Sequence, residues 1–110
     1  IRDFIYCNDV ARGMIFTMEK NIQEPLNLGS GSGTSIKELV ETIIDNYHST
    51  PQIKWDKTKP TGDRKRILDT TKAKKLGFEP ETSLSEGIAK TIRWYSSNRK
   101  FLNGKFNAFN

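Results

Sequence analysis

The stretch LNLGSGSGTSIKELV, residues 26–40, constrains the fold of this chain more than any other part of its sequence. The apolar run at 25–28 is typical of a buried strand, and alternating glycines follow it. Ser35 and Glu38 then form the pattern of a helix-capping box, in which each side chain can bond the other residue's backbone amide. A strand, a glycine-rich connection and an amphipathic helix in this order predict an α/β arrangement.

The same glycines raise the question of a dinucleotide-binding loop, whose fingerprint is G-x-G-x-x-G between a strand and a helix. Gly29 and Gly31 match its first two glycines, and Asp56 ends a later predicted strand, as the acidic residue of the fingerprint would. Thr34, however, stands where the third glycine is needed. The capping box also satisfies the helix amides that a pyrophosphate would bind. We therefore favour a flexible strand-to-helix connection over a cofactor site.

Apolar periodicity predicts three main helices with short strands, a mixed α+β arrangement for a piece of this length. The first helix follows Asn8 or Asp9, either of which can cap it, and the second follows the capping box described above. The third follows Ser83, which starts a second capping-box pattern. A short helical turn spans 72–76 and ends at Gly77. The expected strands are residues 2–6, 25–28 and 52–55.

The first predicted helix carries an apolar face formed by Val10, Met14 and Met18. Gly13 within this helix costs about 1 kcal/mol relative to alanine, which indicates that another segment packs closely against it. An apolar face without a partner favours association, so we expect this chain to self-associate or to exchange elements between copies.

Composition narrows the classes of function. The 110 residues suit one domain with a modest core, and 35% hydrophobic with 28% charged residues indicate a globular chain. No apolar run approaches the roughly 18–20 residues of a membrane span. A single cysteine, Cys7, excludes an internal disulfide framework, and the single histidine, His48, is expected on the surface. We therefore expect a cytoplasmic protein without a metal site.

The net charge of +5 is concentrated between residues 54 and 75, which hold nine lysines or arginines and three aspartates. Residues 59–62, Lys-Pro-Thr-Gly, have the composition of a turn, and a run of three cations at 64–66 follows. Turn amides and guanidinium groups suit phosphate oxygens, so a phosphate site is one interpretation. A solvated charged loop is another. Nucleic-acid binding is a third, although few aromatic residues accompany these charges.

Several motifs in a fixed order identify a resemblance. RDFIYCNDVARGM, EPLNLGSG, SIKELVETI, KPTGDRKRILDTTKAKKLGFEP and SLSEGIAKTIRWY together resemble the C-terminal part of NAD(P)-dependent nucleotide-sugar epimerases, dehydratases and reductases. These enzymes are the extended short-chain dehydrogenases, and the GDP-fucose synthase branch is the most similar. The resemblance covers residues 1–96 and leaves 97–110 as a basic, polar tail that we expect to be loosely held.

The resemblance implies a C-terminal segment of an extended Rossmann-type enzyme, separated from its dinucleotide-binding half. In such enzymes the cofactor glycine loop and the catalytic Tyr-x-x-x-Lys pair belong to the N-terminal half. Neither motif occurs here, so the resemblance implies no catalytic residue and no bound NAD or NADP for this chain alone. Its expected partners are a nucleotide-diphosphate sugar and the missing half. The alternative is a free-standing basic module that binds nucleic acid or an anionic protein.

The resemblance also implies a set of substrate-binding positions. Arg2 matches an arginine that reaches the substrate diphosphate, and Arg66 matches a cation that meets the nucleotide. Asn27 matches an asparagine that contacts the nucleotide in related dehydratases. Lys59 stands where relatives often place an arginine, and Thr61 replaces an acidic residue of the fucose-synthase branch. Asp69 is instead expected to cap the following turn.

Overall fold

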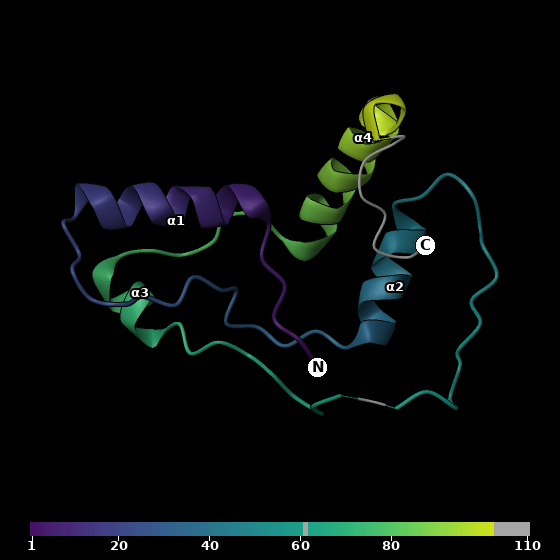
Figure 1. Ribbon diagram of the computed structural model, residues 1–110, viewed down its shortest axis with the longest axis horizontal. Helices are drawn as coiled ribbons and strands as arrows, with labels where there is room; N and C mark the ends of the chain where they lie inside the picture. The colour runs from purple at the N-terminus through teal and green to yellow at the C-terminus, as the bar shows by residue number, and fades with distance from the viewer. Residues whose placement is uncertain (61, 103–110) are drawn as a thin grey trace.

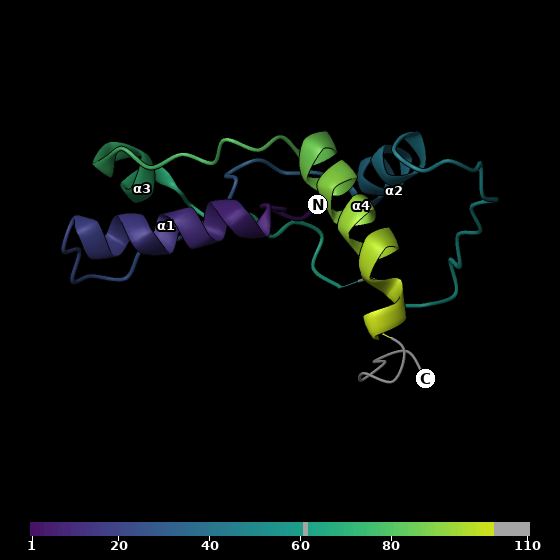
Figure 2. The ribbon, with the colours of Figure 1, turned by 90° about the horizontal axis from the view of Figure 1, so that it is seen from above.

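The computed structural model describes residues 1–60 and 62–102. Within these residues four helices follow one another along the chain, joined by extended segments (Figure 1). They are α1 (Cys7–Glu19), α2 (Ile36–Asp45), α3 (Thr71–Leu76) and α4 (Leu84–Leu102). Helices α2 and α4 pack against each other, and Figure 2 shows them side by side, away from the labels of α1 and α3.

The three expected strands do not form, and this part of the mixed α/β prediction is wrong for the described residues. Sheet pairing there is limited to isolated bridges at Arg2, which pairs antiparallel with Thr34 and parallel with Arg66. Arg2 and Thr34 exchange two backbone hydrogen bonds of 2.9 Å each. A strand persists only where its amides and carbonyls find a neighbouring strand. The apolar segments at 25–28 and 52–55 have no such neighbour among the described residues.

Helix α1 begins two or three residues earlier than a cap at Asn8 or Asp9 would allow. The capping position is Tyr6, whose extended backbone precedes the first turn and whose side chain makes no capping hydrogen bond. Asp9 instead lies within the first turn, where a negative charge interacts favourably with the helix dipole. The predicted cap is therefore wrong, because the Asp9 carboxylate binds other partners.

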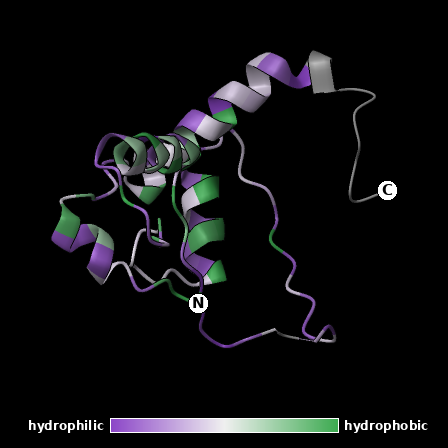
Figure 3. Ribbon diagram, turned by 60° about the vertical axis from the view of Figure 1, so that its left-hand side comes forward, coloured by the Kyte–Doolittle hydropathy of each residue, from purple (hydrophilic) through white to green (hydrophobic). Residues whose placement is uncertain are grey.

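The capping box of α2 is confirmed. Ser35 Oγ accepts a hydrogen bond from Glu38 N at 3.1 Å, and Glu38 Oε2 accepts one from Ser35 N at 2.7 Å. Figure 3 shows hydrophobic residues recurring along the coils of this helix, as its sequence periodicity predicts.

The ends of α3 and α4 test two further predictions. Gly77 terminates α3 in the left-handed conformation, with φ of 96°, as expected. At the start of α4, Ser83 Oγ accepts a hydrogen bond from Glu86 N at 3.3 Å. The helix continues to Leu102, so residues 97–102 of the predicted tail are helical. Residues 103–110 lie outside the described part of the chain.

The apolar core lies between α1 and the turn that follows α3. Ala73 and Phe78, exposed by only 2% and 4%, are its buried hydrophobic residues, and the ring of Phe16 packs 5.7 Å from that of Phe78. A Cβ at Gly13 would lie 2.7 Å from Leu28 and 2.9 Å from Phe78. The close packing predicted at this glycine is therefore confirmed.

Many of the other large apolar side chains in the described residues are exposed. Met18 is 79% exposed on α1, and the neighbouring Met14 and Ile15 are more than half exposed. Trp94 and Tyr95 are similarly open on α4. The described chain thus buries a small core and leaves apolar helix faces uncovered.

A buried carboxylate joins α1 to the segment that leads into α4. Asp9 is 1% exposed and accepts hydrogen bonds from the amides of Glu81 at 3.1 Å and Thr82 at 3.0 Å. Arg12 Nη1 donates to the same carboxylate at 2.7 Å. Desolvation opposes ionisation, but these hydrogen bonds outweigh it and lower the pKa of Asp9 below its ordinary value.

Candidate substrate-binding site

Three chain segments meet at the backbone of Arg2. The bridge to Thr34 joins Arg2 to the glycine-rich connection. The bridge to Arg66 joins it to the basic segment, residues 54–75. Arg66 N donates to the carbonyl of Ile1 at 3.0 Å, which fixes the second contact. A hollow of about 240 Å³ opens at this junction. Its lining comes from all three segments: Arg2, Asp3, Ile5, Gly29, Arg66 and Leu68.

The Arg2 side chain is half-buried and contacts the loop that begins at Asp63, after the Lys-Pro-Thr-Gly stretch at 59–62. Its Nη1 donates to the carbonyls of Ile1 and Asp63, each at 2.8 Å. A Cβ at Gly62 would lie 3.4 Å from Arg2 Nη2, so this glycine leaves room for the guanidinium group. Arg2 therefore holds the basic loop close to the hollow while its remaining N–H groups keep their donor character.

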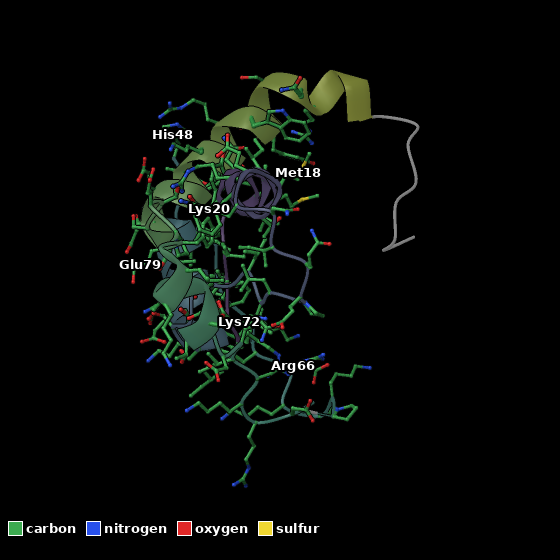
Figure 4. All side chains as sticks on the ribbon, turned by 90° about the vertical axis from the view of Figure 1, so that its left-hand side faces the viewer. Met18, Lys20, His48, Arg66, Lys72 and Glu79 are labelled. Carbon is green, nitrogen blue, oxygen red and sulfur yellow. The ribbon has the colours of Figure 1, made fainter. Side chains whose placement is uncertain are left out.

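Arg66 is the second arginine that lines the hollow. Its side chain is exposed, whereas its backbone is fixed by the bond to Ile1. Figure 4 labels Arg66 in the lower half of the view, apart from Met18 of α1. Arg2 and Arg66 are thus the two predicted site residues that the structure brings together, and both carry charges suited to phosphate oxygens.

The other predicted site residues lie elsewhere or outside the described chain. Lys59 is exposed on the turn before Gly62. Asn27 is also exposed, and its Nδ2 donates to the carbonyl of Asp69 at 3.1 Å, which ties two loops together. Thr61 lies outside the described residues. The capping position of α3 is Thr70, and its side chain makes no capping bond; Asp69, one residue earlier, accepts from Thr71 N at 2.9 Å through Oδ1.

Asp3 is a residue that the sequence did not single out. Its carboxylate binds backbone amides of the glycine-rich connection. Its Oδ1 accepts from Ser30 N at 2.8 Å and from the Ser30 hydroxyl, and its Oδ2 accepts from Gly31 N at 3.0 Å. Leu68 N donates to the same Oδ2 at 3.3 Å. Desolvation opposes ionisation, but the hydrogen bonds prevail and lower the pKa of Asp3. No local sequence signal marks this carboxylate, because its partners lie 27 and 65 residues away.

These contacts decide the question raised by the glycines. The Ser30 and Gly31 amides bind an internal carboxylate, and the start of α2 is closed by the capping box of Ser35 and Glu38. The donors of this loop therefore do not fit the pyrophosphate of a dinucleotide. The connection is a structural loop whose amides hold the chain's own anion.

Part of the basic stretch is neutralised within the chain. Lys72 Nζ pairs with Glu24 at 2.6 Å and also donates to the carbonyl of Pro25 at 3.1 Å. Lys74 Nζ lies 3.8 Å from a carboxylate oxygen of Glu79. Two of the three lysines of α3 thus face acidic partners, whereas Arg66 at the hollow lies on the preceding loop.

The described part of the chain contains neither a metal-binding cluster nor a membrane-spanning helix. No group of three or more histidine, cysteine, aspartate or glutamate side chains is placed to hold a metal ion there. Among the described residues, no helix is long and apolar enough to cross a membrane.

Comparison with known proteins defines the family. Residues 1–91 match the family model described as GDP-mannose 4,6 dehydratase, which is most of the chain. This chain belongs to that family. The family assignment confirms the predicted resemblance to NAD(P)-dependent nucleotide-sugar epimerases and dehydratases.

Individual relatives match over most of this chain but over a minor part of their own length. A probable GDP-L-fucose synthase 1 of Oryza sativa subsp. japonica is 34% identical over 99 residues, 89% of this chain and 30% of the relative. The GDP-L-fucose synthase of Escherichia coli K12 is 32% identical over 114 residues, 94% of this chain and 36% of the relative. A putative UDP-glucose 4-epimerase of Methanocaldococcus jannaschii is 34% identical over 100 residues, 90% of this chain and 32% of the relative. The chain thus spans about a third of the length of these relatives.

Proposed function

We propose that this chain is the nucleotide-sugar-binding segment of an NAD(P)-dependent epimerase, dehydratase or reductase. The observation that carries the proposal is the convergence of Arg2 and Arg66 on one hollow. Two arginines from separate chain segments match the two phosphates of a nucleoside diphosphate in charge, and guanidinium groups suit phosphate oxygens. Family membership and the names of the GDP- and UDP-sugar relatives support the same substrate class.

In this proposal the remaining predicted residues surround the diphosphate. Lys59 supplies a third cation from the turn. Thr61, two residues later in the sequence, also contacts the substrate. Asn27 contacts the nucleoside, whether or not its Nδ2 keeps its hydrogen bond to the carbonyl of Asp69. Each role comes from the sequence resemblance, and each is tested by the substitution of that residue.

The chemical step belongs to the parent enzyme rather than to this segment. NAD or NADP supplies hydride transfer at the sugar, and the dinucleotide-binding half would hold the cofactor and the Tyr-x-x-x-Lys pair. The Ser30 and Gly31 amides of the glycine loop already bind Asp3, which supports assigning the cofactor to the dinucleotide-binding half. We therefore infer that the 110-residue chain binds substrate without converting it.

Calorimetric titration with UDP, GDP, dTDP and CDP tests the proposal. We expect saturable binding of one diphosphate, weakened about 10- to 100-fold by Arg66→Ala, because a hydrogen bond to a charged group contributes about 1.5–3 kcal/mol. Arg93→Ala is the matched control, since it removes the same charge from the exposed surface of α4. Equal affinities of these two variants would refute the assigned site.

A duplex DNA titration separates the alternative function. A nucleic-acid-binding module would bind DNA with an affinity that falls steeply with salt, by a logarithmic slope of about −0.9 per neutralised phosphate. The proposed site would discriminate among nucleotides and leave DNA unbound. Saturable DNA binding together with silence toward all four diphosphates would replace the proposal with the basic-module alternative.

A further inference from the structure

We infer that Asp3 is a positioning residue of the diphosphate site: its carboxylate holds together the two segments that carry Arg2 and Arg66. This inference rests on the function proposed above and adds a residue for which no binding role was predicted. Asp3 lies next to Arg2 in the chain, and its partner Leu68 lies two residues after Arg66. The carboxylate therefore acts beside both arginines.

The bonds of Asp3 span separate segments. Ser30 and Gly31 donate from the glycine-rich connection, and Leu68 donates from the basic segment. The same segments are also joined by the bridges at Arg2, by the bond of the Ile1 amine to the carbonyl of Arg64 at 2.7 Å and by the bond of Arg2 Nη1 to the carbonyl of Asp63. Three amides and one hydroxyl on a single ionised group are a strong local restraint, because hydrogen bonds to a charge are about twice as strong as neutral ones.

The glycines of the connection have a physical explanation in this contact. A Cβ at Gly29 would lie 2.9 Å from Asp3 Oδ2 and 3.0 Å from Leu68 Cδ1. Gly31 adopts a φ of 67°, and a Cβ there would lie 2.5 Å from Thr70 Oγ1. Residues without side chains at both positions let the loop close over the carboxylate.

Electrostatics alone predicts the opposite effect of removing this charge. Asp3 lines the same hollow as the arginines, so its negative charge repels a bound diphosphate. Neutralising it would then strengthen binding. Under the positioning role, neutralising Asp3 weakens binding, because the arginines lose their fixed separation. The direction of the change therefore distinguishes the two effects.

The test compares Asp3→Asn with the unchanged chain in the nucleoside diphosphate titration. Asparagine keeps the shape of the side chain but turns one acceptor into a donor that faces the Gly31 or Ser30 amide. We expect at least a tenfold loss of affinity. Asp45→Asn, the same chemical change at the exposed end of α2, is the control and is expected to leave affinity unchanged. Equal or tighter binding by Asp3→Asn overturns the inference.

Hydrogen exchange provides a readout that does not need a ligand. The Thr34 and Arg66 amides form the bridges beside Asp3, so both are expected to exchange at least tenfold faster in Asp3→Asn, with helix α4 unchanged. Unchanged exchange overturns the inference even if no diphosphate binds. Silence of the unchanged chain toward every diphosphate refutes the proposed function separately. If Asp3→Asn fails to fold, Ser30→Ala replaces it, because this change removes only the hydroxyl donor to Asp3. We then expect a smaller acceleration of exchange at the same amides, and unchanged exchange overturns the inference.

Discussion

The buried carboxylate of Asp9 gives the sharpest prediction for stability. Its two amide partners, Glu81 and Thr82, belong to the segment before α4, so this contact joins distant parts of the chain. In Asp9→Asn the amide oxygen can accept from one of these N–H groups, while the new NH₂ group faces the other. One buried donor left without an acceptor costs about 1–3 kcal/mol.

The contact with Arg12 adds a smaller amount. The Arg12 side chain is 42% exposed, and solvent-accessible ion pairs contribute about 1 kcal/mol or less. The expected loss of unfolding free energy for Asp9→Asn is therefore about 1–4 kcal/mol. Because every 1.4 kcal/mol changes an equilibrium constant tenfold, a 3 kcal/mol loss would shift the folding constant roughly 100-fold.

Urea unfolding followed by far-ultraviolet circular dichroism measures this loss. Glu19→Gln, an acid-to-amide change at the exposed last residue of α1, is the control and should leave the midpoint nearly unchanged. If Asp9→Asn shifts the midpoint no further than the control does, the reasoning about the buried carboxylate is wrong.

The pH dependence of the same difference follows from the sign of the pKa shift. The pKa of folded Asp9 lies below its ordinary value of 3.8, so the unfolded chain takes up the proton first as pH falls. The stability from this ionised carboxylate is complete above the ordinary pKa and is lost as pH falls through the folded pKa. The gap between the unchanged chain and Asp9→Asn should narrow over that acidic range. A gap independent of pH would contradict ionisation of Asp9 in the folded chain.

Three other substitutions test local features of the fold. Ser35→Ala should cost about 1 kcal/mol of unfolding free energy by removing the α2 cap, while Ser32→Ala should not; equal urea midpoints would exclude the cap as a source of stability. Gly77→Ala should cost about 1–2 kcal/mol through its left-handed backbone alone, because nothing lies within 4 Å of the added Cβ; an unchanged midpoint would contradict this. Replacing Met14 and Met18 with lysine should convert a self-associating chain to monomer in sedimentation, and a concentration-independent monomer mass before substitution would refute self-association.

The features predicted correctly from sequence are those determined by nearby residues. Ser35 and Glu38 are three positions apart, so their capping box is visible in the sequence and present in the structure. Gly77 likewise ends α3 through its own backbone conformation. The close packing at Gly13 was also predictable, although its partners Leu28 and Phe78 were not.

The features that sequence reasoning missed depend on distant partners. Asp9 was expected to cap α1, but its acceptors serve amides 72 and 73 residues away, which no local pattern reveals. The roles of Asp3 depend on partners equally remote in sequence. Strands were predicted from β-forming composition, yet strand formation depends on a neighbour that the described residues do not supply.

The pairing of Arg2 with Arg66 shows what a resemblance adds. Their charges and loop positions left a solvated surface as an open interpretation. The resemblance selected Arg2, Lys59 and Arg66 from eighteen lysines and arginines, and the backbone bridges bring Arg2 and Arg66 to one hollow. Charge alone could not have made this selection, because other cations of the basic stretch, such as Lys72, pair with acidic side chains.

The most direct test of the substrate-binding role is a map of backbone amide chemical shifts during titration with the diphosphate that binds. We predict that the shifts cluster at residues 1–3 and 62–68, around Arg2 and Arg66, and leave the C-terminal half of α4 unchanged. Shifts that cluster on α1 and α3, or that spread evenly over the surface lysines, would contradict a diphosphate site where the segments of Arg2, Thr34 and Arg66 meet.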